Sequence, residues 1–275
     1  MIRLINLLST NRIYASVSIL VYFALVIFPH EWVGVNINAL FSSMPRSTYN
    51  LIILICFLCV LFGIGFFISK KLLVHPERNL LMYYLALTLA LIYIVNSTLF
   101  VVNIESVHYI QYGVGAILLF GLIRQYYVVL FIAFLISLFD EGYQYFYLSP
   151  QRTDYFDIND IITDFLGTAF GLIILRIYSL KSCGDSNLKF KWRVMLLLIV
   201  GIVSLLAAIR SDFLSVFPSQ DNYMLVRKMQ EGFWTTVNPN VTFHVVGPIE
   251  GLLILSFLFF IYYFCFRVKS EELVR

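Results

Sequence analysis

The sequence predicts an all-α, polytopic membrane protein, a bundle of about eight transmembrane helices with both termini in the cytoplasm. The first reason is composition: 60% of the 275 residues are hydrophobic, 13% are charged, and the mean hydropathy is +0.86, as in a membrane domain rather than a soluble globule. The second is that apolar residues gather in eight runs bounded by charged or turn-forming residues. Membrane lipids are the expected partners of such a chain. Nucleic acid is not expected, because the basic residues form no cluster.

The predicted spans follow one another through short connections. The first follows Arg3 and Arg12 like a signal-peptide core, yet no small-x-small cleavage site comes after it, so it is interpreted as an uncleaved helix. The first, fifth and seventh are short for a full crossing, and the uncharged run 32–45 is expected to lie in the membrane interface or to re-enter the membrane. The eight spans are 13–28, 51–68, 80–102, 107–123, 126–139, 158–180, 194–209 and 243–266.

The distribution of Lys and Arg orients this bundle. With the N-terminus inside, 14 of the 19 basic residues lie in cytoplasmic segments and 5 on the opposite side, a bias that favours both termini inside. Twelve of the 16 acids then lie outside or in the outer halves of helices. The carboxylate-rich stretch 140–171 is therefore expected on the extracytoplasmic side.

One predicted helix in that stretch carries carboxylates that would be costly within a membrane span. Between Asp164 and Arg176 only 11 uncharged residues remain, about 17 Å of helix at 1.5 Å per residue, which is far short of the ~30 Å hydrocarbon core. If the helix spans, Asp164 and Asp160 lie at membrane depth. Carboxylates there are costly and normally face a bundle interior or a wet cavity, so they indicate a functional site.

Helical geometry places these acids on narrow faces of two predicted helices. At about 100° per residue, one stripe contains Asp157, Asp160, Asp164, Gly167 and Gly171, and a second contains Glu105, His108, Tyr112 and Gly115. The glycine spacing lets a neighbouring helix approach closely. We expect the two stripes to face each other, so that His108 meets the aspartates in a partly desolvated pocket.

Each candidate also has a structural interpretation. Asp157 or Asp160 would serve equally as a helix N-terminal acid, stabilised by free backbone N–H groups and the macrodipole. His108 would serve as an interfacial or hydrogen-bonded core residue, and Arg152 as a loop charge that balances nearby acids.

A second acid lies near the start of the last predicted span. His244 and Glu250 differ by 240° on a helix and have Pro248 between them, so they are predicted to form no ligand pair. Glu250 itself is expected to be buried at depth and to complete the carboxylate pocket.

The order of these motifs resembles the VanZ-like membrane proteins over about residues 80–180. The residues that carry the resemblance are Glu105-x-x-His108 with Tyr112, Asp140-Glu141-x-x-Gln144, Arg152, Asp157-x-x-Asp160, Asp164-x-x-Gly167 and Gly171. It implies a bacterial integral membrane protein of the plasma membrane, and the founding member is associated with resistance to the glycopeptide teicoplanin. It also divides the chain into two added N-terminal spans (1–79), a four-helix core (80–180), and two C-terminal spans with an amphipathic outer segment (181–275).

Three functions remain open, and they leave open whether the chain is an enzyme. The favoured one is binding or modification of a lipid-linked or amphiphilic ligand in the cell envelope. The others are an intramembrane hydrolase or transferase with His/carboxylate acid–base chemistry, for which Mg²⁺ or Ca²⁺ would be the fitting cation, and a proton-coupled transporter. The candidate catalytic residues are Glu105, His108, Asp140, Glu141, Asp160 and Asp164, and the candidate ligand-binding residues are Tyr112, Gln144, Arg152, Asp157 and Glu250.

Overall fold

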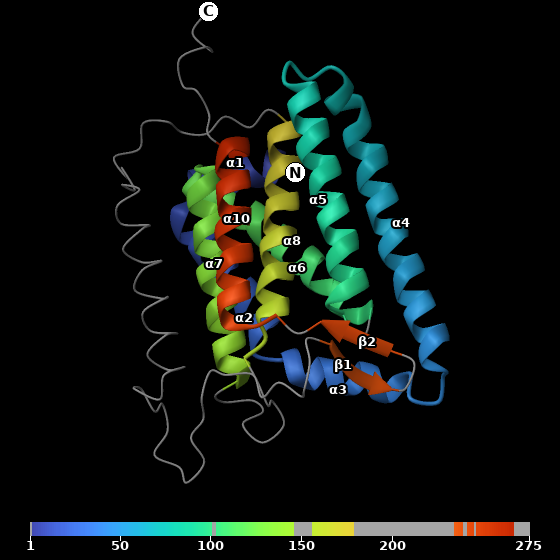
Figure 1. Ribbon diagram of the computed structural model, residues 1–275. Coiled ribbons are helices and arrows are strands. Elements are labelled where there is room, and N and C mark those ends of the chain that lie inside the picture. The colour runs from blue at the N-terminus through green and yellow to red at the C-terminus, as the bar shows by residue number, and fades with distance from the viewer. Residues whose placement is uncertain are drawn as a thin grey trace, which may run out of the picture.

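The computed structural model shows a bundle of long helices with one small β-hairpin at its end (Figure 1). It describes residues 2–100, 103–145, 156–178, 234–238, 241–244 and 246–266. In these ranges six helices are long and apolar enough to cross a membrane, or seven spans if the bent pair α1 and α2 counts as one. The helical membrane bundle is thus confirmed. The predicted span 194–209 lies outside the described residues, and the total of eight spans stays a prediction, as do the sidedness of the termini and the division into three parts.

The N-terminal region contains two short helices, α1 and α3, that were not predicted as helices. Helix α1 (Ile2–Thr10) precedes α2 (Arg12–Ile27), which corresponds to the first predicted span, and the two meet at 118°. The uncharged run 32–45 overlaps α3 (His30–Leu40), which lies across one end of the bundle in Figure 1. Its place in the membrane interface stays a prediction.

The remaining helices correspond to the predicted spans. They are α4 (Arg46–Leu73), α5 (Arg78–Thr98), the 3₁₀ turn η1 (Asn103–Ser106), α6 (Val107–Ile123), α7 (Tyr126–Tyr143), α8 (Ile158–Ile177) and α10 (Pro248–Phe266). Helix α6 has the predicted bounds, α4 and α7 are longer, α5 is shifted, and α8 and α10 are shorter. Helix α7 has 18 residues, so the prediction that the fifth span is short was wrong. Its polar C-terminal turn remains helical after the apolar run ends.

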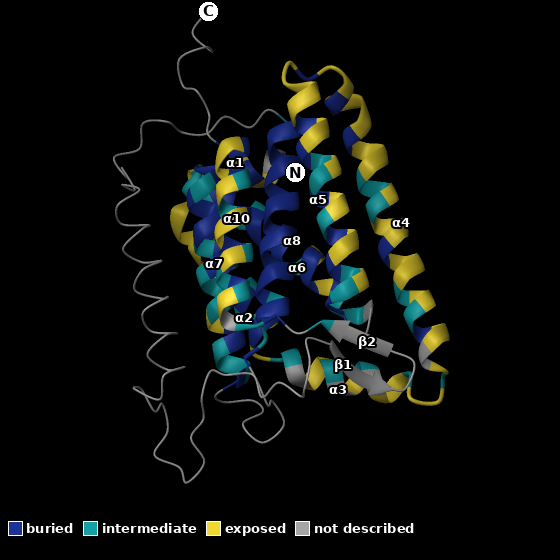
Figure 2. Cartoon of the chain, in the orientation of Figure 1, coloured by how far each residue is buried: buried dark blue, intermediate teal, exposed yellow. Residues whose placement is uncertain are grey.

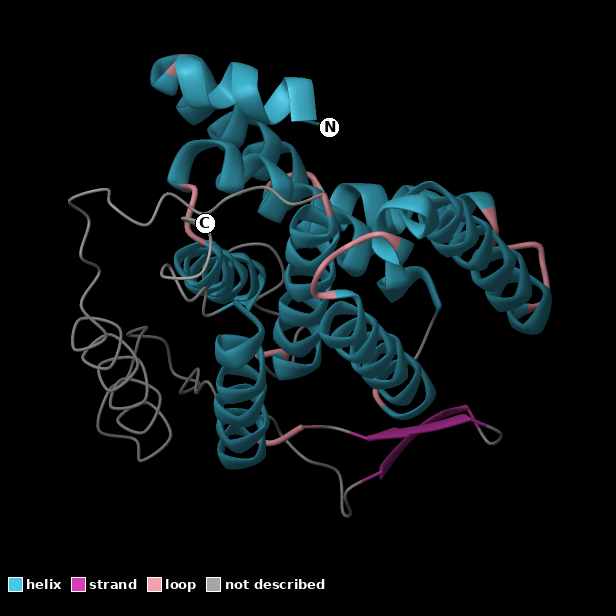
Figure 3. Ribbon diagram, turned by 90° about the horizontal axis from the view of Figure 1, so that it is seen from above, coloured by secondary structure: helices cyan, strands magenta, loops and turns pink. Residues whose placement is uncertain are grey.

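The start of the last span was also predicted wrongly. Residues Val241–His244 form strand β2, which pairs antiparallel with β1 (Trp234–Asn238), and α10 begins only at Pro248. Pro is favoured in the first turn of a helix, where its missing N–H costs nothing. Seen from above in Figure 3, the two strands lie at the periphery of the helices.

Helix α8 is the centre of the bundle. It contacts α5, α6, α7 and α10. Every residue of α8 except Asp160 is buried, so the helix is dark blue along its length in Figure 2. By contrast, only 11% of the residues in the most apolar part of α4 are buried, and side chains such as Phe62 and Phe67 are exposed. Because burial on nearly all sides places α8 inside the protein, Asp164 faces protein groups rather than lipid.

The C-terminal end of α8 is held by an ion pair. Arg176 in its last turn donates to both carboxylate oxygens of Glu77, with its Nη2 at 2.9 Å from each. Glu77 belongs to the connection between α4 and α5. This bidentate contact ties the central helix to the peripheral pair α4 and α5.

Candidate functional site

The closest helix pair in the site is α6 and α8, and glycines allow the approach. A Cβ at Gly167 would lie 2.7 Å from the Tyr109 backbone, and one at Gly171 would overlap the carbonyl oxygen of Gly113. The predicted close packing at Gly167 and Gly171 is therefore confirmed. Gly115 was placed wrongly, because it faces Phe23 of α2 instead, and Gly113 takes the position opposite α8.

His108 and Asp164 meet across this contact. The imidazole Nδ1 lies 2.9 Å from Asp164 Oδ1, and Ser137 Oγ on α7 donates to Asp164 Oδ2 at 2.6 Å. His108 is 3% exposed, and Asp164 and Ser137 are fully buried. The predicted meeting of the two stripes is confirmed for this pair, and the carboxylate is held from both adjoining helices.

A second cluster lies beside it at the end of α7. Tyr112 Oη donates to Asp140 Oδ2 at 3.1 Å, and Gln144 Nε2 donates to Asp140 Oδ1 and to Glu141 Oε1, each at 3.1 Å. Asp140, Glu141 and Tyr112 are all buried. The Asp-Glu-x-x-Gln motif therefore works as one unit, because the i+3 and i+4 spacing brings the amide over both acids.

Asp157 has a structural role. It is the N-cap of α8, and its side chain accepts a hydrogen bond from the Asn159 backbone N–H at 2.9 Å. This is the N-terminal alternative predicted for that residue, and it satisfies one of the free N–H groups of the first turn.

Two hydrogen-bonding groups remain available at the edge of the clusters. Asp160 is half-buried and makes no hydrogen bond to any residue in the described ranges, and His108 uses only Nδ1 among them. Glu105, in the 3₁₀ turn before α6, is also half-buried. We call the half-buried Glu105 and Asp160, together with His108 Nε2, the rim of the site.

His30, at the start of α3, lies against this rim. Its ring centroid is 5.2 Å from that of His108. Burial and then the neighbouring His108 lower the pKa of His30 below its usual 6.5, while Asp140 and Asp160 oppose the shift. The residue therefore favours its neutral form, and it connects α3 to the buried cluster.

Glu250 was placed wrongly by the sequence. It does not join the carboxylate clusters but pairs with His244, whose Nε2 lies 2.7 Å from Glu250 Oε1. The pairing was predicted not to form on a single helix, and it forms because His244 belongs to β2 while Glu250 is in the first turn of α10. The Glu250 side chain is 42% exposed, so the expected burial at depth is wrong as well.

Sequence reasoning missed Ser137 and His30. Ser137 had a usable signal, since it is a polar residue in an apolar run, three and four positions before Asp140 and Glu141 and so on their helix face. His30 had none, because its contact with His108 depends on the turn between α2 and α3. Arg152 lies outside the described residues. Within the described ranges, no group of three or more His, Cys, Asp or Glu side chains is arranged to hold a metal ion.

Comparison with known proteins gives one result. A family model described as VanZ/LLP1 matches residues 15–179, which confirms the predicted resemblance and extends it to the first two predicted spans. The matched segment contains His108, Asp140, Asp164 and the glycines of α8. No curated protein and no solved structure matches the chain.

Proposed function

The chain belongs to the VanZ/LLP1 family, and from this membership and the site geometry we propose that it is a bacterial cell-envelope protein of the plasma membrane that binds a lipid-linked or amphiphilic ligand. The polar end of the ligand would enter at the outer end of α6, α7 and α8, on the extracytoplasmic side, with both termini in the cytoplasm. Membrane lipids are the surroundings and the source of such ligands.

One observation carries the proposal. The buried acids Asp140, Glu141 and Asp164 have protein hydrogen-bond partners, whereas Asp160 and His108 Nε2 at the rim have none in the described ranges. Polar groups at membrane depth whose hydrogen bonds the protein does not complete are costly unless water or a ligand completes them. The interior groups are therefore proposed to hold the site in shape, and the rim groups to contact the ligand.

The experiment compares co-purifying molecules by native mass spectrometry in mild detergent. We expect a specific amphiphile on the wild type that is lost in Asp160→Asn and in His108→Ala. Asp157→Asn is the matched control, because Asn caps a helix as well as Asp does, and it should retain the amphiphile. Equal ligand content in all four folded proteins would contradict the proposal.

A link to glycopeptide resistance is a separable part of this proposal, supported by family membership alone. Bacteria that express the wild type should tolerate more teicoplanin than bacteria with the His108→Ala variant at the same membrane level. If the two strains are equally susceptible while the variant has lost the ligand, the binding site stands and the resistance link fails.

A second function, acid–base catalysis by an intramembrane hydrolase or transferase, is favoured by the orientation of His108. Asp164 pairs with Nδ1, and Nε2 makes no hydrogen bond within the described ranges, as in sites where a carboxylate orients a histidine that moves a proton. Catalysis predicts that His108→Ala accumulates an intact amphiphile that the wild type converts to a species of different mass. Binding alone predicts that the wild type and variants that still bind in part, such as Gln144→Ala, hold an amphiphile of the same mass.

A further inference from the structure

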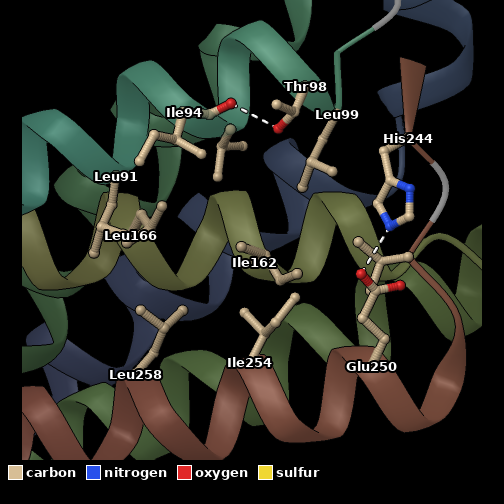
Figure 4. A pocket seen from close by; sticks show the side chains of 12 residues that line it. Leu91, Ile94, Thr98, Leu99, Ile162, Leu166, His244, Glu250, Ile254 and Leu258 are labelled. Atoms are coloured by element: carbon tan, nitrogen blue, oxygen red, sulfur yellow. Dashed lines mark hydrogen bonds and ion pairs between the residues drawn. The ribbon is translucent and has the colours of Figure 1, made fainter. Parts of the chain in front are cut away.

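A concave site lies on the opposite side of α8 from the carboxylate clusters. It is a groove of about 500 Å³ whose floor is Ile162 and Leu166 of α8 and whose walls are α5 and α10 (Figure 4). Ile162 and Leu166 are each two residues from Asp164, about 200° around the helix, so they face away from the carboxylates. No residue that lines this groove belongs to the rim or to the buried clusters.

The groove is closed toward the inner end of the helices. There Tyr262 of α10 shares a 2.6 Å hydrogen bond with Thr88 of α5, and Tyr84 donates to the backbone of Ile261 at 3.3 Å. Toward the outer end the two helices are instead separated by the groove. Along α10 it extends from Glu250 to Leu258, about 12 Å at 1.5 Å per residue, which is less than half of the ~30 Å hydrocarbon core.

The outer end of the groove is rigid and polar. Asn159, 4% exposed, donates to the carbonyl oxygens of Leu99 and His244 and accepts from the Val246 N–H. These bonds hold the segment between β2 and α10 in place. The pair His244 and Glu250 lies at this end, with the Glu250 carboxylate half-exposed, while most of the side chains deeper in the groove are aliphatic (Figure 4).

We propose that this groove binds one acyl chain of an outer-leaflet lipid whose headgroup carries a primary ammonium. The three helices are candidate membrane spans, so the side of the groove that opens between α5 and α10 meets lipid chains. Its length suits one leaflet, and its closed inner end prevents a chain from passing through. Among the described residues that line it, Glu250 is the only Asp, Glu, Lys or Arg. Its carboxylate pairs with His244 at 2.7 Å and accepts from the Gly247 N–H at 3.3 Å, yet it is 42% exposed and each oxygen has a further lone pair, so charge complementarity favours a cationic donor over an anionic headgroup.

The test titrates the full-length protein in detergent with phosphatidylethanolamine, phosphatidylcholine and phosphatidylglycerol of identical acyl chains and counts bound lipids by native mass spectrometry. We expect phosphatidylethanolamine to bind about tenfold more tightly than phosphatidylcholine, whose quaternary ammonium cannot donate a hydrogen bond, because one charge-assisted bond supplies about that factor. Glu250→Gln should remove this preference and still bind a chain.

Tryptophan variants test the position of the chain. Ile254→Trp fills the groove and should lose the bound lipid, whereas Leu253→Trp, at a neighbouring α10 position that is 65% exposed and outside the groove, should retain it. If Ile254→Trp does not fold, Ile94→Trp on the α5 wall replaces it.

Two results would overturn the proposal. Equal lipid binding by the groove-filling variant and by Leu253→Trp would show that the chain lies elsewhere or that another protein segment occupies the groove. Equal affinity of the wild type for all three lipids would refute ammonium recognition. His108→Ala should leave this binding unchanged, so failure here is distinguishable from failure of the proposed function.

Discussion

Replacing Asp164 by alanine should destabilise the protein strongly, because two buried groups lose their partner at once. The carboxylate accepts from Ser137 at 2.6 Å and pairs with His108 at 2.9 Å, and all three side chains are at most 3% exposed. An unpaired buried polar group costs roughly 1–3 kcal/mol, and breaking a buried ion pair costs roughly 3–5 kcal/mol. We therefore expect a loss of about 3 kcal/mol in the free energy of unfolding.

A double-mutant cycle separates this interaction from general damage. Unfolding in mixed micelles is measured for the wild type, Asp164→Ala, His108→Ala and the double variant. Because each single variant leaves the other partner buried and unpaired, the double variant should be more stable than the sum of the single losses predicts, by about 1–3 kcal/mol. Additivity within about 0.5 kcal/mol would refute the claim that the two side chains stabilise each other.

Three further predictions concern the packing, the ion pair between Arg176 and Glu77, and His30. Gly171→Ala should lower the free energy of unfolding by about 1–3 kcal/mol, because the added Cβ overlaps the α6 backbone. Gly63→Ala, with open space around it, should not. Equal melting temperatures of the two variants would contradict the close helix contact. Glu77→Gln should cost about 1–2 kcal/mol in a denaturant titration, since the buried Arg176 loses a charged partner that is itself 45% exposed, and an unchanged midpoint would show that the ion pair contributes nothing. The pKa of His30 is lowered below 6.5 in the folded protein, so the unfolded chain takes up the proton first as the pH falls, and this contribution to stability is retained above about pH 6.5 and lost below it. His30→Gln should reduce the change in melting temperature between about pH 7.5 and about pH 5.5. An identical pH dependence of the melting temperature in both proteins would remove His30 from this role.

The sequence was informative where a regular period relates residues. Asp164 and Gly171 were predicted on one face, and His108 opposite them, because helical geometry converts spacing into direction. The same arithmetic misplaced Gly115, since the face that α6 turns to α8 depends on the contact with α2, which no local pattern encodes.

Predictions failed where the chain changes conformation. Treating His244 and Glu250 as members of one helix separated two residues that touch, because β2 ends before α10 begins. His30 was overlooked for a similar reason, since a turn brings it to His108 from a distant part of the chain. Tertiary contacts of this kind are set by packing, and periodicity carries no information about them.

The central claim is that the rim of the site faces the outside of the cell, and cysteine labelling tests it most directly. In a cysteine-free background, Asp160→Cys at the rim and Arg78→Cys at the opposite end of the bundle are treated in intact cells with a membrane-impermeant maleimide. We expect the cysteine at position 160 to react and the one at 78 to react only after the membrane is permeabilised. The reverse pattern would place the carboxylate site in the cytoplasmic half and contradict the account.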